Sequence, residues 1–109
     1  MEEAVIITIP LGVTEFEFDD EHCRELESQL AQAVDASESG EYDGNEFGKG
    51  VCKLFLYGPS ADAILRIVLP ILLDKSLPPG SYATKRYRTP GSRDVLVKIV
   101  PPPDPLIHA

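Results

Sequence analysis

The sequence predicts an α+β fold in which an antiparallel sheet carries two helices on one face. The predicted elements follow one another as strand, helix, strand, strand, helix, strand, strand. The first six form a split β-α-β arrangement, which in one sheet is the ferredoxin-like plait, and the seventh adds a C-terminal strand. A chain of 109 residues that is 43% hydrophobic can bury its own core. We therefore expect one domain over residues 1–100 and a proline-rich extended tail over 101–109.

The first strand and the first helix have the clearest local signals. Residues 4–9 are mostly β-branched and end at Pro10, which predicts a buried strand. Asp19 or Asp20 can cap a helix, because a short carboxylate accepts hydrogen bonds from the free amides of the first turn. Apolar residues then recur three and four positions apart, a core-facing stripe that ends near 37–40: Cys23, Leu26, Leu30, Ala33 and Val34.

A hairpin is predicted next. Residues 41–47 form a short polar strand, and the glycine-flanked segment 48–50 forms a turn, with Asp43-Gly44 as the alternative turn. Residues 51–57 alternate in the pattern of a half-buried strand, which places Cys52 among the core side chains. A buried thiol of this kind is expected to be inert.

The second helix is predicted over residues 61–75, with Ser60 as its cap. It is apolar nearly all round, which predicts deep burial. Asp62, Arg66 and Asp74 share one row with Pro70, so the proline is expected on the solvent side, with a mild kink rather than a break. Two further strands are predicted over 82–88 and 95–100, with Val95, Val97 and Ile99 on one face of the last.

Charge is distributed unevenly along the chain. The net charge is −8, which argues against broad binding to nucleic acid or anionic lipid. Residues 1–48 hold 14 acids and one base, a net −13, whereas residues 49–109 hold 4 acids and 9 bases, a net +5. Either the two halves neutralise each other inside the fold, or the molecule presents charged surfaces to partners.

No motif for metal, phosphate or nucleotide chemistry is complete. Asp43, Asn45 and Gly48 match three positions of a calcium loop, but its final ligand position holds Leu54. The two histidines, His22 and His108, form no ligand cluster in sequence. The Lys-Gly opening at 49–50 is typical of an RNA-binding module, but non-aromatic residues occupy its stacking positions. We expect no metal, no cofactor and no nucleic-acid partner.

Two groups of residues are candidate binding sites. Phe55 and Tyr57 alternate with core residues and should lie on the sheet face that the helices leave open. The second group gathers bases around one aromatic residue and could bind a phosphate, a carboxylate or an acidic protein: Lys85, Arg86, Tyr87, Arg88 and Arg93. The alternative is an edge strand that its charges protect from aggregation.

The middle of the chain resembles a group of small uncharacterised bacterial proteins. The resemblance covers residues 40–82 and comprises a Gly-x-x-Asp-Gly turn at 40–44, a Gly-x-Gly hairpin at 48–50, a strand ending in Tyr-Gly-Pro at 57–59 and an Ala-Asp-Ala helix start at 61–63. Pro70 and the Leu-Pro-Pro-Gly-Ser run at 77–81 also fit. The resemblance implies no known activity, so no catalytic residue follows from it.

The sequence favours a non-enzymatic interaction or regulatory module in the bacterial cytoplasm. The absence of a secretion signal and the two cysteines predict free thiols there. The partner would be an unidentified protein, or a second copy bound through the sheet, with no membrane partner. One form is an immunity-type protein that neutralises a basic toxin through its acids: Glu15, Glu17, Asp19, Asp20, Glu25 and Glu27. The alternative is an anionic-ligand binder or enzyme that uses the 85–93 cluster, with Asp43 or Glu46 as acid/base.

Overall fold

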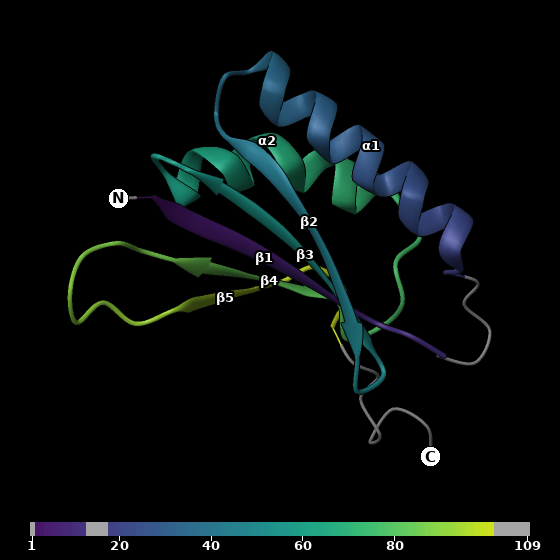
Figure 1. The fold of residues 1–109 in the computed structure, drawn as a ribbon. Helices are drawn as coiled ribbons and strands as arrows, with labels where there is room; N and C mark the ends of the chain where they lie inside the picture. The colour runs from purple at the N-terminus through teal and green to yellow at the C-terminus, as the bar shows by residue number, and fades with distance from the viewer. Residues whose placement is uncertain (1, 13–17, 102–109) are drawn as a thin grey trace.

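The computed structural model describes residues 2–12 and 18–101, which form a mixed α+β fold with two helices and a five-stranded antiparallel sheet (Figure 1). In chain order the elements are β1 (Glu3–Pro10), α1 (Asp20–Ala36), β2 (Glu41–Gly48), β3 (Val51–Gly58), α2 (Ala61–Asp74), β4 (Tyr82–Arg86) and β5 (Val95–Lys98). The predicted order of elements is therefore confirmed.

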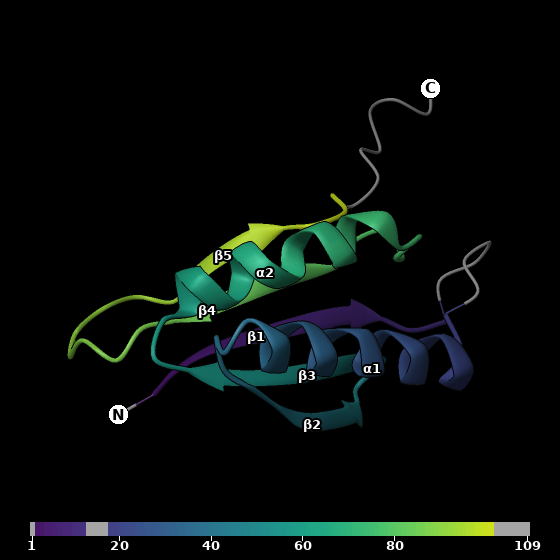
Figure 2. The ribbon, with the colours of Figure 1, turned by 90° about the horizontal axis from the view of Figure 1, so that it is seen from above.

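The strands lie side by side in the order β2-β3-β1-β4-β5, and each neighbouring pair is antiparallel. Both helices pack on one face of this sheet (Figure 2). α1 contacts β2 and α2, whereas α2 contacts β1, β3 and β4. Within the described ranges, no helix or strand lies on the other face. We call it the open face; the side chains that alternate with the core residues point to it: Ala4, Ile6, Thr8, Lys53, Phe55, Tyr57, Tyr82, Thr84, Arg86, Leu96 and Lys98.

The core lies between the sheet and the two helices. Val5, Ile7 and Ile9 of β1 pair with Leu56, Leu54 and Cys52 of β3, and all six side chains are fully buried. The predicted stripe of α1 packs onto them, with its buried positions spaced three and four residues apart. Ala33, which belonged to the predicted stripe, is only half-buried at its margin.

Both helices begin at the predicted caps. Asp19 accepts a hydrogen bond from the His22 amide at 3.0 Å, and the Ser60 hydroxyl accepts one from the Ala63 amide at 3.1 Å. Each cap satisfies an amide that has no partner within its helix. The glycine-flanked turn after β2 is also confirmed, with Lys49 and Gly50 at positive φ. The alternative turn at Asp43-Gly44 is instead a β-bulge inside β2.

The predicted deep burial of the second helix is wrong on one side. Pro70 is exposed, as expected, and α2 continues through it. However, Leu73 is 60% exposed and Leu69 is only half-buried. The reason is that only the sheet and α1 cover α2, so the side that points away from both reaches solvent.

The last two strands are shorter than predicted. β4 ends at Arg86, so Tyr87 and Arg88 lie beyond it. β5 ends at Lys98, because the amides of Ile99 and Val100 both donate to the Ser81 carbonyl at 3.0 Å and leave the regular ladder. Of the predicted tail, only residue 101 is described.

Candidate functional site

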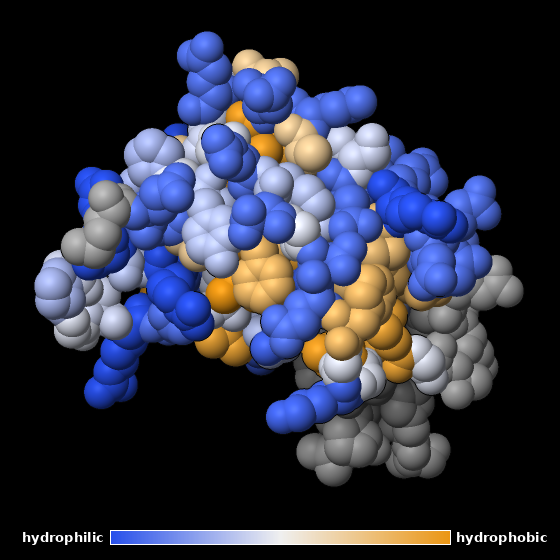
Figure 3. Space-filling view, in the orientation of Figure 1, coloured by the Kyte–Doolittle hydropathy of each residue, from blue (hydrophilic) through white to orange (hydrophobic). Residues whose placement is uncertain are grey.

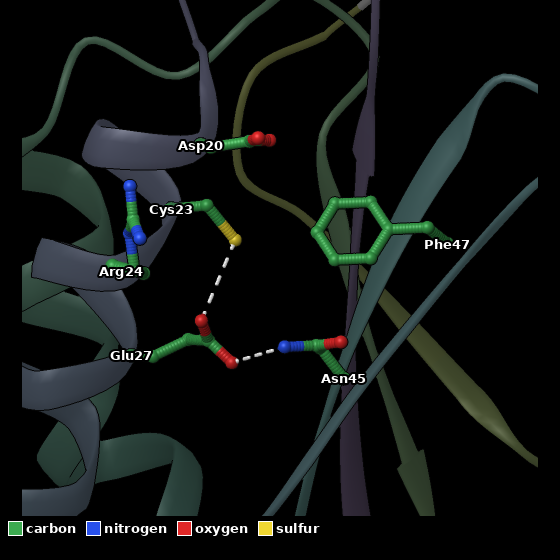
Figure 4. A pocket seen from close by; sticks show the side chains of 6 residues that line it. All are labelled: Asp20, Cys23, Arg24, Glu27, Asn45 and Phe47. Atoms are coloured by element: carbon green, nitrogen blue, oxygen red, sulfur yellow. Dashed lines mark hydrogen bonds between the residues drawn. The ribbon is translucent and has the colours of Figure 1, made fainter.

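A cleft lies between α1 and the helix-facing side of β2. We call it the α1–β2 cleft; its volume is about 310 Å³. In Figure 4, Cys23 and Glu27 point from α1 toward β2, and Phe47 points back from β2 toward the helix. The lining residues come from these two elements: Asp20, Cys23, Arg24, Glu27, Asn45 and Phe47.

Glu27 is the centre of the hydrogen-bond network in this cleft. Its Oε1 accepts from the Tyr42 hydroxyl and from Asn45 Nδ2, the latter at 2.6 Å, and its Oε2 accepts from Cys23 Sγ at 3.8 Å. Burial raises the pKa of Tyr42, and the Glu27 carboxylate beside it adds to the rise. Three donors from α1 and β2 thus hold one carboxylate, so the network fastens the helix to the edge strand.

The two cysteines meet beneath this cleft. Cys23 Sγ lies 3.7 Å from Cys52 Sγ, and both are buried free thiols. Burial, followed by the neighbouring Cys52, raises the pKa of Cys23 to about 12, and burial also raises the pKa of Cys52. Because the thiolate is the nucleophile, protonated thiols of this kind are poorly suited to nucleophilic catalysis. This burial fits the expectation that Cys52 is inert.

We expect both thiols to resist a disulfide reagent such as Ellman's in the native protein. With a pKa of about 12, the Cys23 thiolate is on the order of one part in 10⁴ at pH 8. Colour should develop at least about 100-fold faster once guanidinium unfolds the chain and both thiols become exposed. Rapid labelling of either thiol in the folded protein would contradict the described burial.

Two of the four bases in the predicted cluster, Lys85 and Arg86, form ion pairs with acids. Lys85 Nζ lies 2.9 Å from Asp62 Oδ1 at the start of α2, and the Tyr87 hydroxyl donates to the same oxygen at 2.7 Å. The Tyr87 bond first, and then the Lys85 bond, lower the pKa of Asp62. Arg86 points to the open face and lies 3.2 Å from Asp94 Oδ2. The Arg88 amide donates to Glu3 Oε2 at 3.3 Å.

The structure does not bring the five cluster residues onto one surface. Lys85 and Tyr87 both contact Asp62 of α2. Arg86 points to the opposite face of the sheet, and Arg93 is exposed in the β4–β5 loop. Asp43 and Glu46 lie on β2, at the far edge of the sheet from β4 and β5. The acid/base residues of the enzyme alternative are therefore not near the bases that they would serve.

Acids gather on one side of the molecule, but the bases are spread over it. The exposed acids Asp20, Glu21 and Glu25 lie on α1, and others lie on β2 at one edge of the sheet. Five of the ten bases lie on or beside β4 and β5 at the other edge: Lys85, Arg86, Arg88, Arg93 and Lys98. The other five lie elsewhere, and one of them, Lys75, forms an ion pair with Glu25 on α1 at 3.4 Å. Of the acids proposed for toxin binding, Glu15 and Glu17 lie outside the described residues.

The open face carries the other predicted pair. Phe55 and Tyr57 are half-buried there on β3, next to the central strand β1, and Phe55 pairs with Ile6 of β1. A shallow hollow of about 360 Å³ lies toward β5, lined by six residues: Gly80, Ser81, Tyr82, Leu96, Lys98 and Val100. Figure 3 views the β2 edge, where hydrophilic side chains dominate and hydrophobic surface shows between them over the strands.

Sequence patterns place Cys23, Glu27 and Asn45 in other roles but do not bring them together in one cleft, and no pattern singles out Leu96. Cys23 and Glu27 are four residues apart on one helix face, which is a signal that they act together. The bulge at 42–44 obscured the position of Asn45, because it changes which side chains of β2 face α1. Leu96 alternates with three apolar residues, at positions 95, 97 and 99, and their pattern singles out the other face of the strand.

Metal and membrane features are absent from the described ranges. His22 Nδ1 lies 2.6 Å from Oδ1 of Asp19, the N-cap residue of α1. His108 lies outside those ranges. Over residues 2–12 and 18–101, no three His, Cys, Asp or Glu residues form a group that could hold a metal ion. Neither helix in these ranges is long and apolar enough to cross a bilayer.

Comparison with protein-family models, with curated proteins and with solved structures finds no match to this chain.

Proposed function

We propose that this protein is a non-enzymatic protein-interaction module that binds through the open face of its sheet. The observation that carries the proposal is the apolar surface on that face, where Phe55 and Tyr57 are half-buried and Leu96 is 62% exposed. Aromatic and aliphatic side chains that neighbouring strands hold rigidly lose little entropy on binding. The hollow beside Tyr82 and Leu96 can seat a partner's side chain.

The charge pairs of the hairpin favour this function over binding of a small anion. Lys85 already forms an ion pair with Asp62, and Arg86 already forms one with Asp94. A phosphate or carboxylate ligand would have to displace these partners. An extended protein surface has no such cost, because it can match the existing pairs by its own charges.

The strand order supports the finer description of the fold as a ferredoxin-like plait. Read from β4, four strands run β4-β1-β3-β2, and each helix connects two strands that have one strand between them. β5 extends the sheet beyond β4 as a hairpin. The proposal includes a reducing cytoplasmic location, which the two free thiols only 3.7 Å apart support.

The test is capture from an extract of the native source on immobilised protein. We expect wild type to retain a specific protein, and the Leu96→Lys variant to lose it, because a charge would replace an exposed apolar contact. Leu73→Lys is the matched control: Leu73 is 60% exposed, but on α2 rather than on the open face. Equal retention by the two variants would refute the proposed surface, and no retention by wild type would refute tight binding of another protein through it.

A further inference from the structure

The middle row of the open face crosses the sheet and carries apolar side chains at three of its five positions, of which Ile6 is only 8% exposed. We call this row the hydrophobic strip. Antiparallel neighbours lie directly opposite each other, so the pairing register defines such rows. Ile6 of β1 lies between Phe55 of β3 and Thr84 of β4, and Thr84 pairs with Leu96 of β5. On the other side, Phe55 pairs with Gly44 of β2. The strip therefore ends in a protruding leucine at one edge and in a glycine at the other.

The adjacent row carries opposite charges at its two ends. From β2 to β5 it comprises Glu46, Lys53, Thr8, Tyr82 and Lys98. Glu46 and Lys98 are both exposed and occupy opposite edges of the sheet. In this row the β2 edge is thus acidic and the β5 edge basic; Lys53 lies directly beside Glu46, and Asp94 next to β5 pairs with Arg86. The hydrophobic strip runs alongside this row, from one edge of the sheet to the other.

We propose that this face binds a second copy of the same chain, related by a two-fold axis that runs parallel to β1 between the two sheets. The inference rests on the proposed function, because it names the partner of the same surface. Rotation about this axis reverses the strand order, so β2 of each copy lies over β5 of the other, and β3 lies over β4. The acidic edge then meets the basic edge twice in one closed dimer.

The other face-to-face arrangement is electrostatically unfavourable. A two-fold axis perpendicular to the strands would place β2 over β2. Glu41 and Glu46, the exposed acids on the open face of β2, would then lie against the acids of the same strand in the other copy, and such like-charge contacts oppose association. Charge therefore selects the axis parallel to the strands.

Shape also favours this orientation. Leu96 of one copy lies over the part of β2 near Gly44 of the other, where there is no side chain and where an added Cβ would meet no atom within 4 Å. Lys53 of one copy lies over Tyr82 of the other, a favourable cation–π combination. Packed sheets are rotated by about 30°, so these pairings hold to within about two residues.

The size of the face indicates a reversible dimer. Five strands spaced about 4.8 Å apart, and up to eight residues long, cover on the order of 600 Å² per copy, at the low end for a specific interface. We therefore expect a dissociation constant in the micromolar range, so the dimer forms only at high protein concentration.

Sedimentation of the purified full-length chain, from about 5 to about 500 µM, brackets that range. We expect wild type to pass from monomer to dimer. Glu46→Lys and Lys98→Glu should each weaken the dimer about tenfold, and the double variant should recover most of the loss, because the pair is restored with its signs exchanged. Leu96→Lys should weaken it at least as much, and Leu73→Lys should leave it unchanged.

A chain that stays monomeric over the whole range overturns this inference. It would leave the proposed function standing if the open face still captured another protein. If neither Glu46→Lys nor Lys98→Glu weakens the dimer, the proposed orientation is wrong. It is also wrong if the double variant does not recover the lost affinity. Circular dichroism of each variant shows whether the fold is intact; Glu46, Leu96 and Lys98 are exposed, so we expect no change.

Discussion

Replacement of Leu54 by alanine is expected to lower the free energy of unfolding by about 2 to 5 kcal/mol. Leu54 is fully buried in β3, where it pairs with Ile7 on one side and faces α1 and α2. Truncation removes apolar contacts and leaves a cavity that the rigid sheet cannot close. A small domain is stable by only about 5 to 15 kcal/mol, so this single change would remove a large fraction of the total.

Leu73→Ala is the matched control for this prediction. The chemical change is identical, but Leu73 is 60% exposed on α2, so the loss should be within about 0.5 kcal/mol. Urea unfolding followed by circular dichroism measures both. Similar losses for the two variants would mean that the core does not lie between the sheet and the helices as described.

Replacement of Gly58 by alanine should also destabilise the fold strongly, by about 3 kcal/mol. A Cβ at this position would clash with the Ser39 carbonyl oxygen, and a Cβ at Gly40 would clash with the Tyr57 carbonyl oxygen. Here the chain entering β2 crosses the end of β3 backbone against backbone. Neither clash can be relieved by rotation of a side chain.

Gly48→Ala is the control for the Gly58 variant. At the other end of β2, a Cβ on Gly48 would meet no atom within 4 Å, so the change should be neutral or slightly stabilising. Both variants reduce the backbone freedom of the chain, but only Gly58→Ala introduces a steric clash. A comparison of their thermal unfolding temperatures therefore measures the effect of the clash. If both variants unfold at the wild-type temperature, the close approach of the two strand ends is not real.

These glycines give a physical reason for part of the sequence pattern. Gly40 begins the Gly-x-x-Asp-Gly segment and Gly58 lies in the Tyr-Gly-Pro segment, and the two are in contact. The sequence predicts a turn for the first segment and the end of a strand for the second. Their contact could not be predicted, because it depends on how two distant strand ends pair.

Local features were predictable where the chemistry is local. Asp19 and Ser60 cap helices because their side chains reach amides three residues away. The alternation in β3 predicted which side chains face the core, since the period of a strand is two. The end of β5 was not predictable, because it depends on hydrogen bonds to Ser81, which lies in a different segment.

The candidate surfaces were only partly predictable for the same reason. The alternation of apolar residues placed Phe55 and Tyr57 on the face opposite the core. It could not show that Leu96 would lie in the same row as Phe55. The charge asymmetry along the chain was plain in the sequence. Whether it formed a charged surface depended on the strand order, which places β2 and β5 at opposite edges.

The most direct test of the open face as the interaction surface is methyl cross-saturation by NMR. Deuterated chain with protonated leucine methyls is mixed with unlabelled chain at high concentration, and the unlabelled copy is irradiated. We expect the Leu96 methyls, on the open face, to lose intensity, while those of Leu73, on the outside of α2, keep theirs. Equal intensities for Leu96 and Leu73, or a loss confined to Leu73, would contradict the account.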